Sequence, residues 1–444
     1  MPTFSIENFG CRATEADAVA IRHGMQTDGW ANSLDHEGAE VVILNTCTVT
    51  AAADSQSRDA IRKIHRANPK ACIIITGCYA QRAPEEVASL EGVSCVVGNG
   101  RQGEIPALAR DFLPLSKLRI GEPGGSADRA LVFTTDFLSE TEVEAGSNAS
   151  LTGDMTRPIL KIQDGCNNRC AYCIIPAVRG RSRSLAPDEV IGSVRRFAAA
   201  GVREVVLSGI NLGSYGRDFS PRVPLASVVR RILDETAIEQ IRFSSIEPQH
   251  ITEDFAGLVA SSKRIAPHFH APLQSGCDRI LRAMHRWYRT AHYATRIEFL
   301  RKMLPESAIG ADVIAGFPGE TESDFVATLS FVRQMPLTYL HVFSFSPRPG
   351  TEAATLSGVL PGNVIRERAR ALRALSEEKA RSFRAAQAGS DICALTLSHS
   401  TSSWTEALTP NYLKVRIAGR HAANQWRRVR LTANSEDVIA SRPL

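Results

Sequence analysis

Short apolar runs and amphipathic segments alternate along the first hundred residues of the chain. The apolar runs have the length of buried strands, and the segments between them repeat their apolar positions with the period of a helix. In chain order they are an extended run at 3–9, a helix at 15–27, a strand at 40–44, a helix at 55–67, a strand at 71–75, a helix at 84–90 and a strand at 95–97. Strands that alternate with helices form parallel sheets. The pattern predicts an open parallel α/β sheet as the N-terminal domain, residues 1–120.

The alternation stops over residues 121–154, where Gly-Gly and Gly-Ser-Asn sequences replace the apolar periodicity, and this stretch is predicted to be a linker or an edge hairpin. Strand and helix patterns alternate again over residues 155–360. The strand-like segments are 159–162, 204–207, 240–243, 310–314 and 339–345, and the helical ones include 187–200, 225–235 and 322–334. Repeated β/α units predict a partial TIM-like barrel, with its chemistry at the carboxyl ends of the strands.

The last part of the chain changes pattern once more. Residues 361–386 are highly charged with helical periodicity and are predicted to form a connecting helix. Residues 387–444 hold three strand-like segments, at 392–397, 413–417 and 427–431, and predict a small all-β domain. The fold class is therefore α/β with a β appendage.

Composition places the chain among globular proteins. Of its 444 residues 43% are hydrophobic and 22% are charged, and no apolar stretch approaches the roughly 20 residues that cross a bilayer. The first ten residues show neither a basic segment nor an apolar one, so we expect no secretory signal and a cytoplasmic location. Ten scattered cysteines in a reducing compartment indicate metal ligation or catalysis rather than disulfides.

The positive charge is concentrated at the C-terminus. Residues 361–444 contain 14 Lys and Arg against 7 Asp and Glu, a local charge of +7 in a chain whose net charge is +5. Such an asymmetry suits a polyanionic partner such as a nucleic acid, and the alternative is a solvated charged face.

Three cysteines lie close together directly after the strand predicted at 159–162. Cys166, Cys170 and Cys173 are spaced C-x-x-x-C-x-x-C. Three thiolates on one loop can each hold a corner of an iron-sulfur cube, leaving one iron open, because soft sulfur donors favour iron-sulfur clusters or zinc. The alternative is a zinc site completed by a distant histidine. The spacing, with Tyr172 before the last cysteine, resembles the signature of radical S-adenosylmethionine enzymes.

A second set of cysteines is spread over the N-terminal domain. Cys11, Cys47 and Cys78 each follow the carboxyl end of a predicted strand. These ends line one crevice of a parallel sheet, so we expect the three thiols to converge as ligands of a metal or cluster. The other cysteines are treated separately: Cys72, Cys95 and Cys393 are expected in cores, whereas Cys277 is left undecided.

The two cysteine sets together resemble the methylthiotransferase family of radical S-adenosylmethionine enzymes. The likeness runs from residue 3 to about residue 351 and includes GCYAQ, DGCNNRCAYCIIP, VRGRSRS, PLQSGCDRILRAMHRWY and GADVIAGFPGET. The motifs SGINLGSYG, SSIEP and HVFSFSPRPGT are most similar to the subfamily that methylthiolates N6-threonylcarbamoyladenosine in tRNA. One departure is Arg12-Ala13-Thr14, because the family usually has Lys or Gln and then Asn after its first cysteine.

The resemblance implies two 4Fe-4S clusters, with Cys11, Cys47 and Cys78 on an auxiliary cluster and Cys166, Cys170 and Cys173 as the catalytic set on the radical-generating one. It implies S-adenosyl-L-methionine as methyl donor and radical source, and methylthiolation at C2 of the adenosine next to the anticodon, position 37. The implied partners are tRNA and a reducing electron donor such as a flavodoxin or ferredoxin. The small β domain resembles the RNA-binding barrel of the family.

Further residues are candidates for cofactor or RNA contacts. The cofactor candidates are Tyr172, Ser208, Asn211, Ile314, Gly316 and Glu320, and turn formation is the alternative for those after residue 200. The RNA candidates are Arg179, Arg181, Arg183, Lys414, Arg416, Arg427, Arg428 and Arg430, with a solvated surface as the alternative. The aromatic residues Trp404, Tyr412 and Trp426 either stack on bases or form the β-domain core, and His270, His285 and His292 are interpreted as surface or core histidines rather than ligands.

Other functions compete with methylthiolation of N6-threonylcarbamoyladenosine, and one of them is methylthiolation of another tRNA adenosine. Some relatives modify a ribosomal protein side chain, and the basic C-terminus does not discriminate because a ribosome is also polyanionic. A third hypothesis is a non-catalytic iron-sulfur protein that binds RNA or senses redox state. Reductive cleavage of S-adenosylmethionine would separate this last class from both enzymes.

Overall fold

A computed structural model describes residues 1–118, 130–134, 156–432 and 439–443. They form two compact units, one of residues 1–150, 161–185 and 346–351 and the other of residues 151–160, 186–345 and 352–444. The first unit thus contains both cysteine sets identified from the sequence. None of the helices in the described ranges is long and apolar enough to span a membrane.

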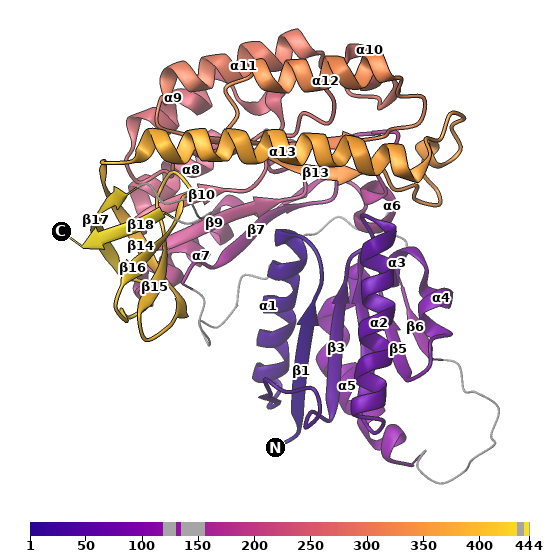
Figure 1. The fold of residues 1–444 in the computed structure, drawn as a ribbon. Helices are drawn as coiled ribbons and strands as arrows, with labels where there is room; N and C mark the ends of the chain where they lie inside the picture. The colour runs from indigo at the N-terminus through magenta and orange to yellow at the C-terminus, as the bar shows by residue number, and fades with distance from the viewer. Residues whose placement is uncertain (119–129, 135–155, 433–438, 444) are drawn as a thin grey trace. The chain divides into compact units, whose positions relative to one another are not determined.

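The N-terminal sheet is entirely parallel, in the order β2-β1-β3-β4-β5-β6 (Figure 1). Its strands are β1 (Thr3–Asn8), β2 (Ala31–Asn32), β3 (Val41–Thr46), β4 (Cys72–Gly77), β5 (Val93–Val97) and β6 (Leu131–Phe133). Its helices are α1 (Arg12–Thr27), α2 (Ala51–Ala67), α3 (Cys78–Arg82), α4 (Pro84–Ala88), η1 (Asn99–Glu104) and α5 (Ile105–Leu118). The predicted open parallel α/β sheet is confirmed. The edge strand β6 falls inside the stretch predicted as a linker, residues 121–154. Residues 130–134 of that stretch are described, and its other residues lie outside the described ranges.

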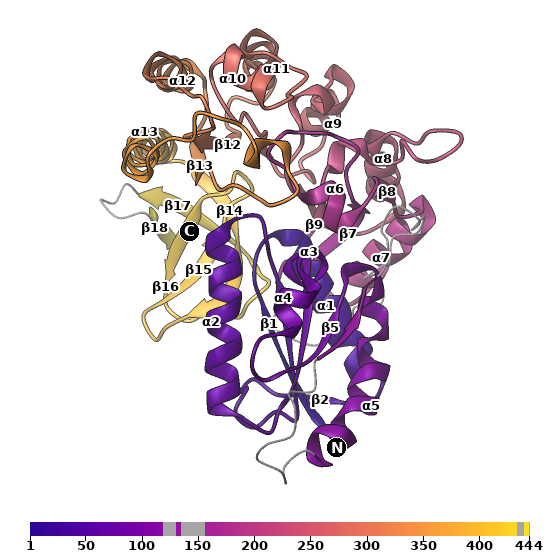
Figure 2. The same cartoon turned by 90° about the vertical axis from the view of Figure 1, so that its right-hand side faces the viewer.

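Two apolar cores cover the two faces of this sheet. Alternate strand residues such as Val42 and Leu44 pack with α2, α3 and α4, while their neighbours Val41 and Ile43 pack with α1 and α5. Figure 2 shows α2 and α5 on opposite sides of the strands. Cys72 and Cys95 are buried in the second core, which confirms the expectation for both.

An incomplete β/α barrel follows the N-terminal sheet in the chain. Strands β10-β9-β7-β8 form one sheet and β11-β12-β13 another, and an isolated bridge between Ser245 and His270 joins β10 to β11. The strands are β7 (Ile159–Asp164), β8 (Arg183–Ser184), β9 (Glu204–Gly209), β10 (Gln240–Phe243), β11 (His268–His270), β12 (Ala308–Ala315) and β13 (Tyr339–Ser344). The helices over residues 175–354 are α6 (Ile175–Arg179), α7 (Pro187–Ala199), η3 (Leu212–Ser214), α8 (Leu225–Glu235), η4 (Pro248–His250), α9 (Glu253–Ser261), α10 (Asp278–Ala283), α11 (Thr290–Met303), α12 (Glu322–Gln334) and η5 (Glu352–Ala354).

A long helix and a small closed barrel complete the chain. The helix α13 (Gly362–Gln387) runs along β13 (Figure 1). The barrel has the order β14-β15-β16-β18-β17, with one parallel pair, β16 with β18, among antiparallel ones. Its strands are β14 (Asp391–Ser400), β15 (Trp404–Leu408), β16 (Lys414–Ala418), β17 (Trp426–Thr432) and β18 (Ile439–Pro443). The predicted partial β/α barrel and small all-β domain are therefore confirmed as folds.

Candidate functional site

Cys11, Cys47 and Cys78 follow three adjacent parallel strands, β1, β3 and β4, at one edge of the sheet. Cys11 is exposed, whereas the other two are buried. Burial, and then the neighbouring Cys78, raises the pKa of Cys47 to about 12, with a smaller contribution from Cys11. The three thiols therefore interact electrostatically, and Cys47 and Cys78 would resist ionisation without a positively charged ligand beside them.

Glycines precede two of these cysteines because the backbone there leaves no room for a side chain. Gly10 has a φ of +118°, and a Cβ on it would lie 2.7 Å from the Cys47 Cβ and 3.0 Å from its Sγ. Gly77 has a φ of +96°, and a Cβ there would lie 2.3 Å from the Thr46 carbonyl oxygen. The Gly-Cys pairs of the sequence thus hold the ends of adjacent strands close together.

A buried arginine lies against the innermost of the three thiols. Arg179 Nε donates to Cys78 Sγ over 3.3 Å, and Asn99 Nδ2 lies 3.6 Å from the same sulfur. Burial raises the pKa of Cys78, and Arg179 opposes that increase. Arg179 is only 2% exposed, so the prediction that it contacts RNA phosphate is wrong. Arg181, only two residues later, is exposed, so the sequence alone did not distinguish the buried arginine from the exposed one.

Arg179 belongs to a network of four buried charges. It donates to Asp17 over 2.7 Å and to Asp164 over 3.1 Å, while Lys161 donates to the same two carboxylates over 2.5 Å and 2.8 Å. Burial acts to raise the pKa of Asp164, but Lys161 and then Arg179 outweigh it and hold that pKa well below its usual range. Two positive and two negative side chains thereby compensate one another away from water.

The network leads directly to the second cysteine set. Asp164 also accepts a hydrogen bond of 2.8 Å from the amide of Gly165, which precedes Cys166. Gly165 has a φ of +68°, and a Cβ there would lie 2.0 Å from the carbonyl oxygen of Arg181. The buried charges therefore support the start of the loop that carries Cys166, Cys170 and Cys173.

The loop that carries this second set is compact. The amide of Cys166 donates to the Gly180 carbonyl over 3.0 Å, and the amide of Cys173 donates to the Cys170 carbonyl over 3.0 Å. All three cysteines and Tyr172 are partly exposed, in contrast to Cys47 and Cys78. Of the neighbouring RNA candidates Arg181 is exposed, whereas Arg183 is 6% exposed, which argues against a phosphate contact by Arg183.

Sequence reasoning missed a second group of buried charges, beside Cys47. Arg348 donates to Asp54 over 2.6 Å, and Arg82 contacts the same carboxylate over 3.1 Å. Arg82 Nε also donates to the hydroxyl of Thr48 over 2.8 Å. The sequence signal for this group is the position of Arg348 in the motif HVFSFSPRPGT. This group therefore holds Thr48, the residue that follows Cys47.

The donor chemistry of both sets fits iron-sulfur clusters. Each set offers three thiols and no competing carboxylate or imidazole in its own loop, and soft sulfur donors select iron-sulfur clusters or zinc. The positive charge of Arg179 at Cys78 additionally favours a bound thiolate.

Comparison with known proteins decides the family. Residues 3–98 match the model described as "Uncharacterized protein family UPF0004", and residues 160–332 match the "Radical SAM superfamily". The protein named "Threonylcarbamoyladenosine tRNA methylthiotransferase MtaB" of Aquifex aeolicus is 35% identical over 415 residues, which cover 94% of this chain and 96% of that protein. The chain belongs to the radical S-adenosylmethionine tRNA methylthiotransferase family. It is therefore a transferase that acts with S-adenosylmethionine and 4Fe-4S clusters.

Two further matches are a relative named for a different adenosine and a solved structure. The "tRNA-2-methylthio-N(6)-dimethylallyladenosine synthase" of Mycobacterium bovis is also 35% identical, over 85% of this chain and 72% of that protein. A solved structure of the radical S-adenosylmethionine methyltransferase TsrM from Kitasatospora setae has a TM-score of 0.57 and 16% identity, covering 80% of this chain and 77% of that one. The latter shows the fold alone. The two relatives share the methylthio chemistry and differ in the adenosine that their names give.

The remaining cofactor candidates of this methylthiotransferase lie in the second unit, at the ends of β9 and β12 and in the turns that follow these strands. Ser208 and Asn211 are buried at the end of β9, where the Asn211 carbonyl accepts hydrogen bonds from Ser214. Glu320 accepts a 3.0 Å bond from the Gly316 amide and a 2.7 Å bond from Arg368 of α13. These contacts favour the alternative of a strand-to-helix turn for Gly316 and Glu320. Ile314 is also buried, at 8% exposed.

The C-terminal barrel presents its basic residues outward. Lys414 and Arg416 of β16 and Arg428 and Arg430 of β17 are exposed, as is Arg427. The apolar residues that alternate with them fill the barrel: Val415, Ile417, Val429 and Leu431. The Arg416 guanidinium lies 4.7 Å from the Trp404 ring centroid on this surface.

The structure also shows the surroundings of Tyr412, Cys393 and Cys277. Tyr412 stacks on His268 with ring centroids 3.9 Å apart, so it packs against β11. Cys393 is exposed on β14, and the expectation that it lies in a core is wrong because its side chain falls on the outward face of the strand. Cys277 is partly buried at the start of α10, where its thiol donates to Asp324 over 3.1 Å.

Proposed function

We propose that this enzyme methylthiolates C2 of N6-threonylcarbamoyladenosine at position 37 of tRNA. The observation that carries the proposal is the buried charge network, Asp17, Lys161, Asp164 and Arg179, that joins Cys78 to the start of the Cys166 loop. Two thiol sets connected in this way suit a reaction that needs two clusters. The motifs SGINLGSYG and HVFSFSPRPGT and the name of the Aquifex relative support the threonylcarbamoyl substrate.

In this proposal Cys166, Cys170 and Cys173 hold the radical-generating cluster, and Cys11, Cys47 and Cys78 hold the auxiliary one. When bound, the clusters and S-adenosylmethionine supply a radical and a methylated sulfur for an aromatic carbon whose hydrogen no side chain is basic enough to remove as a proton. Arg179 stabilises the Cys78 thiolate. Asp17 and Asp164, each of which also pairs with Lys161, hold Arg179 in place. Gly10 and Gly77 let the strand ends approach.

The proposal assigns the remaining parts of the chain as follows. Residues 1–120 form the auxiliary-cluster domain, residues 155–360 the radical domain, and residues 387–444 an RNA-binding domain, connected by residues 121–154 and 361–386. Lys414, Arg416, Arg427, Arg428 and Arg430 contact tRNA phosphates, together with the exposed Arg181. A reducing protein such as a flavodoxin or ferredoxin supplies electrons.

The test is mass spectrometry of tRNA nucleosides from a deletion strain of the source organism. Complementation with the wild-type gene is expected to restore 2-methylthio-N6-threonylcarbamoyladenosine, whereas Cys170→Ala and Cys47→Ala are not. Cys393→Ala, which changes an exposed cysteine outside both sets, serves as the matched control and should restore the nucleoside. Restoration of the dimethylallyl derivative instead would assign the substrate named for the Mycobacterium relative, and no change in any methylthio nucleoside would refute a tRNA substrate.

A further inference from the structure

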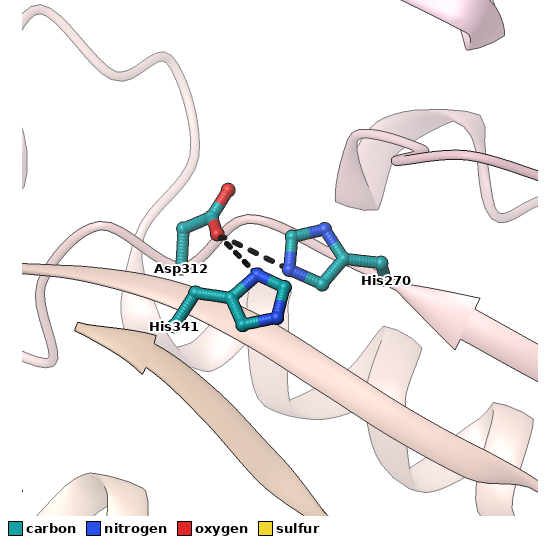
Figure 3. A group of neighbouring side chains, drawn as sticks. All are labelled: His270, Asp312 and His341. Atoms are coloured by element: carbon teal, nitrogen blue, oxygen red, sulfur yellow. Dashed lines mark ion pairs between the residues drawn. The ribbon is translucent and has the colours of Figure 1, made fainter. Parts of the chain in front are cut away.

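Three potential metal ligands lie together on neighbouring strands of the second unit, and none of them belongs to the loops that carry the two cysteine sets. They are His270 at the end of β11, Asp312 in β12 and His341 in β13 (Figure 3). Asp312 and His341 are direct partners across the parallel pair β12–β13. The three side chains share one face of the sheet, and the dashed lines of Figure 3 join both imidazoles to the carboxylate.

The spacing of their donor atoms is that of a coordination polyhedron. His270 Nε2 lies 3.1 Å and His341 Nδ1 lies 3.5 Å from the same atom, Asp312 Oδ1. All three donor atoms fall within 4.8 Å of one another. Zinc-ligand bonds of about 2.0 to 2.1 Å in a tetrahedron place neighbouring ligand atoms about 3.3 to 3.4 Å apart. The two histidine–aspartate distances thus match this spacing to within a few tenths of an ångström, and the two imidazoles would have to adjust to reach it.

The contacts of the His270 ring favour a metal ion between the three side chains. Its Nε2 is buried and lacks the geometry of a hydrogen bond, although Asp312 Oδ1 is 3.1 Å away. Its Nδ1 lies 2.7 Å from the hydroxyl of Ser245. When Nδ1 donates to this hydroxyl, Nε2 carries a lone pair that can bind a metal, which is the usual arrangement around a ligating histidine.

The cluster is also open to solvent on one side. His270 is 6% exposed, whereas the His341 side chain is 55% exposed, so a cation could enter from the His341 side.

We propose that His270, Asp312 and His341 bind one divalent cation of the zinc class, independently of both cysteine sets. Two imidazoles and a carboxylate suit zinc or ferrous iron, and three protein ligands leave a position for water or another oxygen donor. The spacing and the Ser245 contact revise the sequence-based interpretation of His270 as a surface or core histidine. The proposal does not depend on which adenosine the enzyme modifies.

The test is zinc retention by the full-length protein with its iron-sulfur clusters reconstituted. After equilibrium dialysis against zinc and a competing chelator, elemental analysis of the wild type should find one zinc per chain. His270→Gln and Asp312→Asn should each weaken zinc binding at least tenfold. His399→Gln is the matched control, because His399 also lies beside a carboxylate, 3.7 Å from Glu406, on the β barrel. It should retain the zinc.

X-ray absorption at the zinc edge of the wild type removes any dependence on the folding of variants. Nitrogen and oxygen ligands at about 2.0 to 2.1 Å, without sulfur at about 2.3 Å, would support the site. A sulfur shell would place the zinc on cysteines and overturn the proposal. Failure of the wild type to retain zinc, or equal retention by Asp312→Asn, would overturn it as well and leave the triad as an ion pair.

Discussion

At the scale of single residues, the first unit holds its cysteines with charges that are almost fully withdrawn from water. Arg179, Asp17 and Asp164 are each no more than 6% exposed. A buried charge costs several kcal/mol unless it is paired, so removing one member leaves the others unfavourable. The same contacts that order the Cys166 loop therefore make it sensitive to a single substitution.

Replacement of Arg179 by Gln should destabilise the protein by about 3 to 5 kcal/mol, because Asp17 and Asp164 lose a buried partner. The urea midpoint of the first unfolding transition measures the effect. Arg181→Gln, two residues away and exposed, should change stability by less than about 0.5 kcal/mol. Equal midpoints for both variants would contradict the role assigned to Arg179.

His250 provides a pH-dependent contribution to stability. Burial lowers the pKa of His250 from 6.5 to about 4, and both ring nitrogens lack hydrogen-bond partners. The unfolded chain binds a proton on this residue below pH 6.5, while the folded chain binds it only near pH 4. The contribution of His250 to the free energy of unfolding is therefore fully present above pH 6.5. It decreases by up to about 3 kcal/mol as the pH falls to 4.

His250→Phe should flatten the stability profile between pH 6.5 and pH 4, measured by urea unfolding at several pH values. The exposed His399→Phe should leave the slope unchanged. The slope is the relevant readout, because the substitution can also change the stability at neutral pH through packing. A variant slope as steep as that of the wild type would assign the pH dependence to other groups.

At the scale of elements, the junction of each strand with the following helix determines where a cysteine lies. Gly77 is the last residue of β4, directly before α3, and has a backbone conformation that residues with side chains rarely adopt. Its neighbour across the sheet, Thr46, ends β3 directly before Cys47. The close approach of these two backbones brings the residues after the two strands, Cys47 and Cys78, to the same edge.

Gly77→Ala should destabilise the protein by about 3 kcal/mol or more, because it adds a clash with the Thr46 backbone to the cost of a positive φ. Gly201→Ala is the matched control: Gly201 has a φ of +82° and no atom within 4 Å of an added Cβ. It should cost only about 1 to 2 kcal/mol, the strain of the backbone alone. Thermal unfolding of both variants measures the difference, and equal losses would show that the approach of β3 and β4 is easily relaxed.

At the scale of the whole molecule, the excess of positive charge and the two cysteine sets lie in different parts of the chain. The exposed basic residues of β16 and β17 lie on the C-terminal barrel, partly balanced by Glu406 and Asp391. Phosphate contacts release counterions from nucleic acid, so binding through such a surface weakens steeply with salt. The surface of the barrel therefore suits the proposed contacts with tRNA phosphates.

Simultaneous replacement of Lys414, Arg416, Arg428 and Arg430 by Gln should weaken tRNA binding and reduce its salt dependence. Each lost phosphate contact lowers the slope of log affinity against log salt by about 0.7 to 0.9. The matched control replaces four exposed basic residues of the N-terminal unit, Arg62, Lys63, Arg66 and Lys70. Filter binding at several salt concentrations measures both, and equal slopes for the two variants would exclude a specific role for the barrel.

The alternation of apolar runs and helical periods determined the order of elements in the N-terminal sheet, because burial on both faces of a parallel strand leaves a clear local pattern. It also placed Cys11, Cys47 and Cys78 at the carboxyl ends of strands. Only the tertiary structure decided that Arg179 is buried on Cys78 and that His270, Asp312 and His341 converge. Periodicity reports which face of an element is buried, whereas the partner on that face depends on strand order and register between residues far apart in the chain.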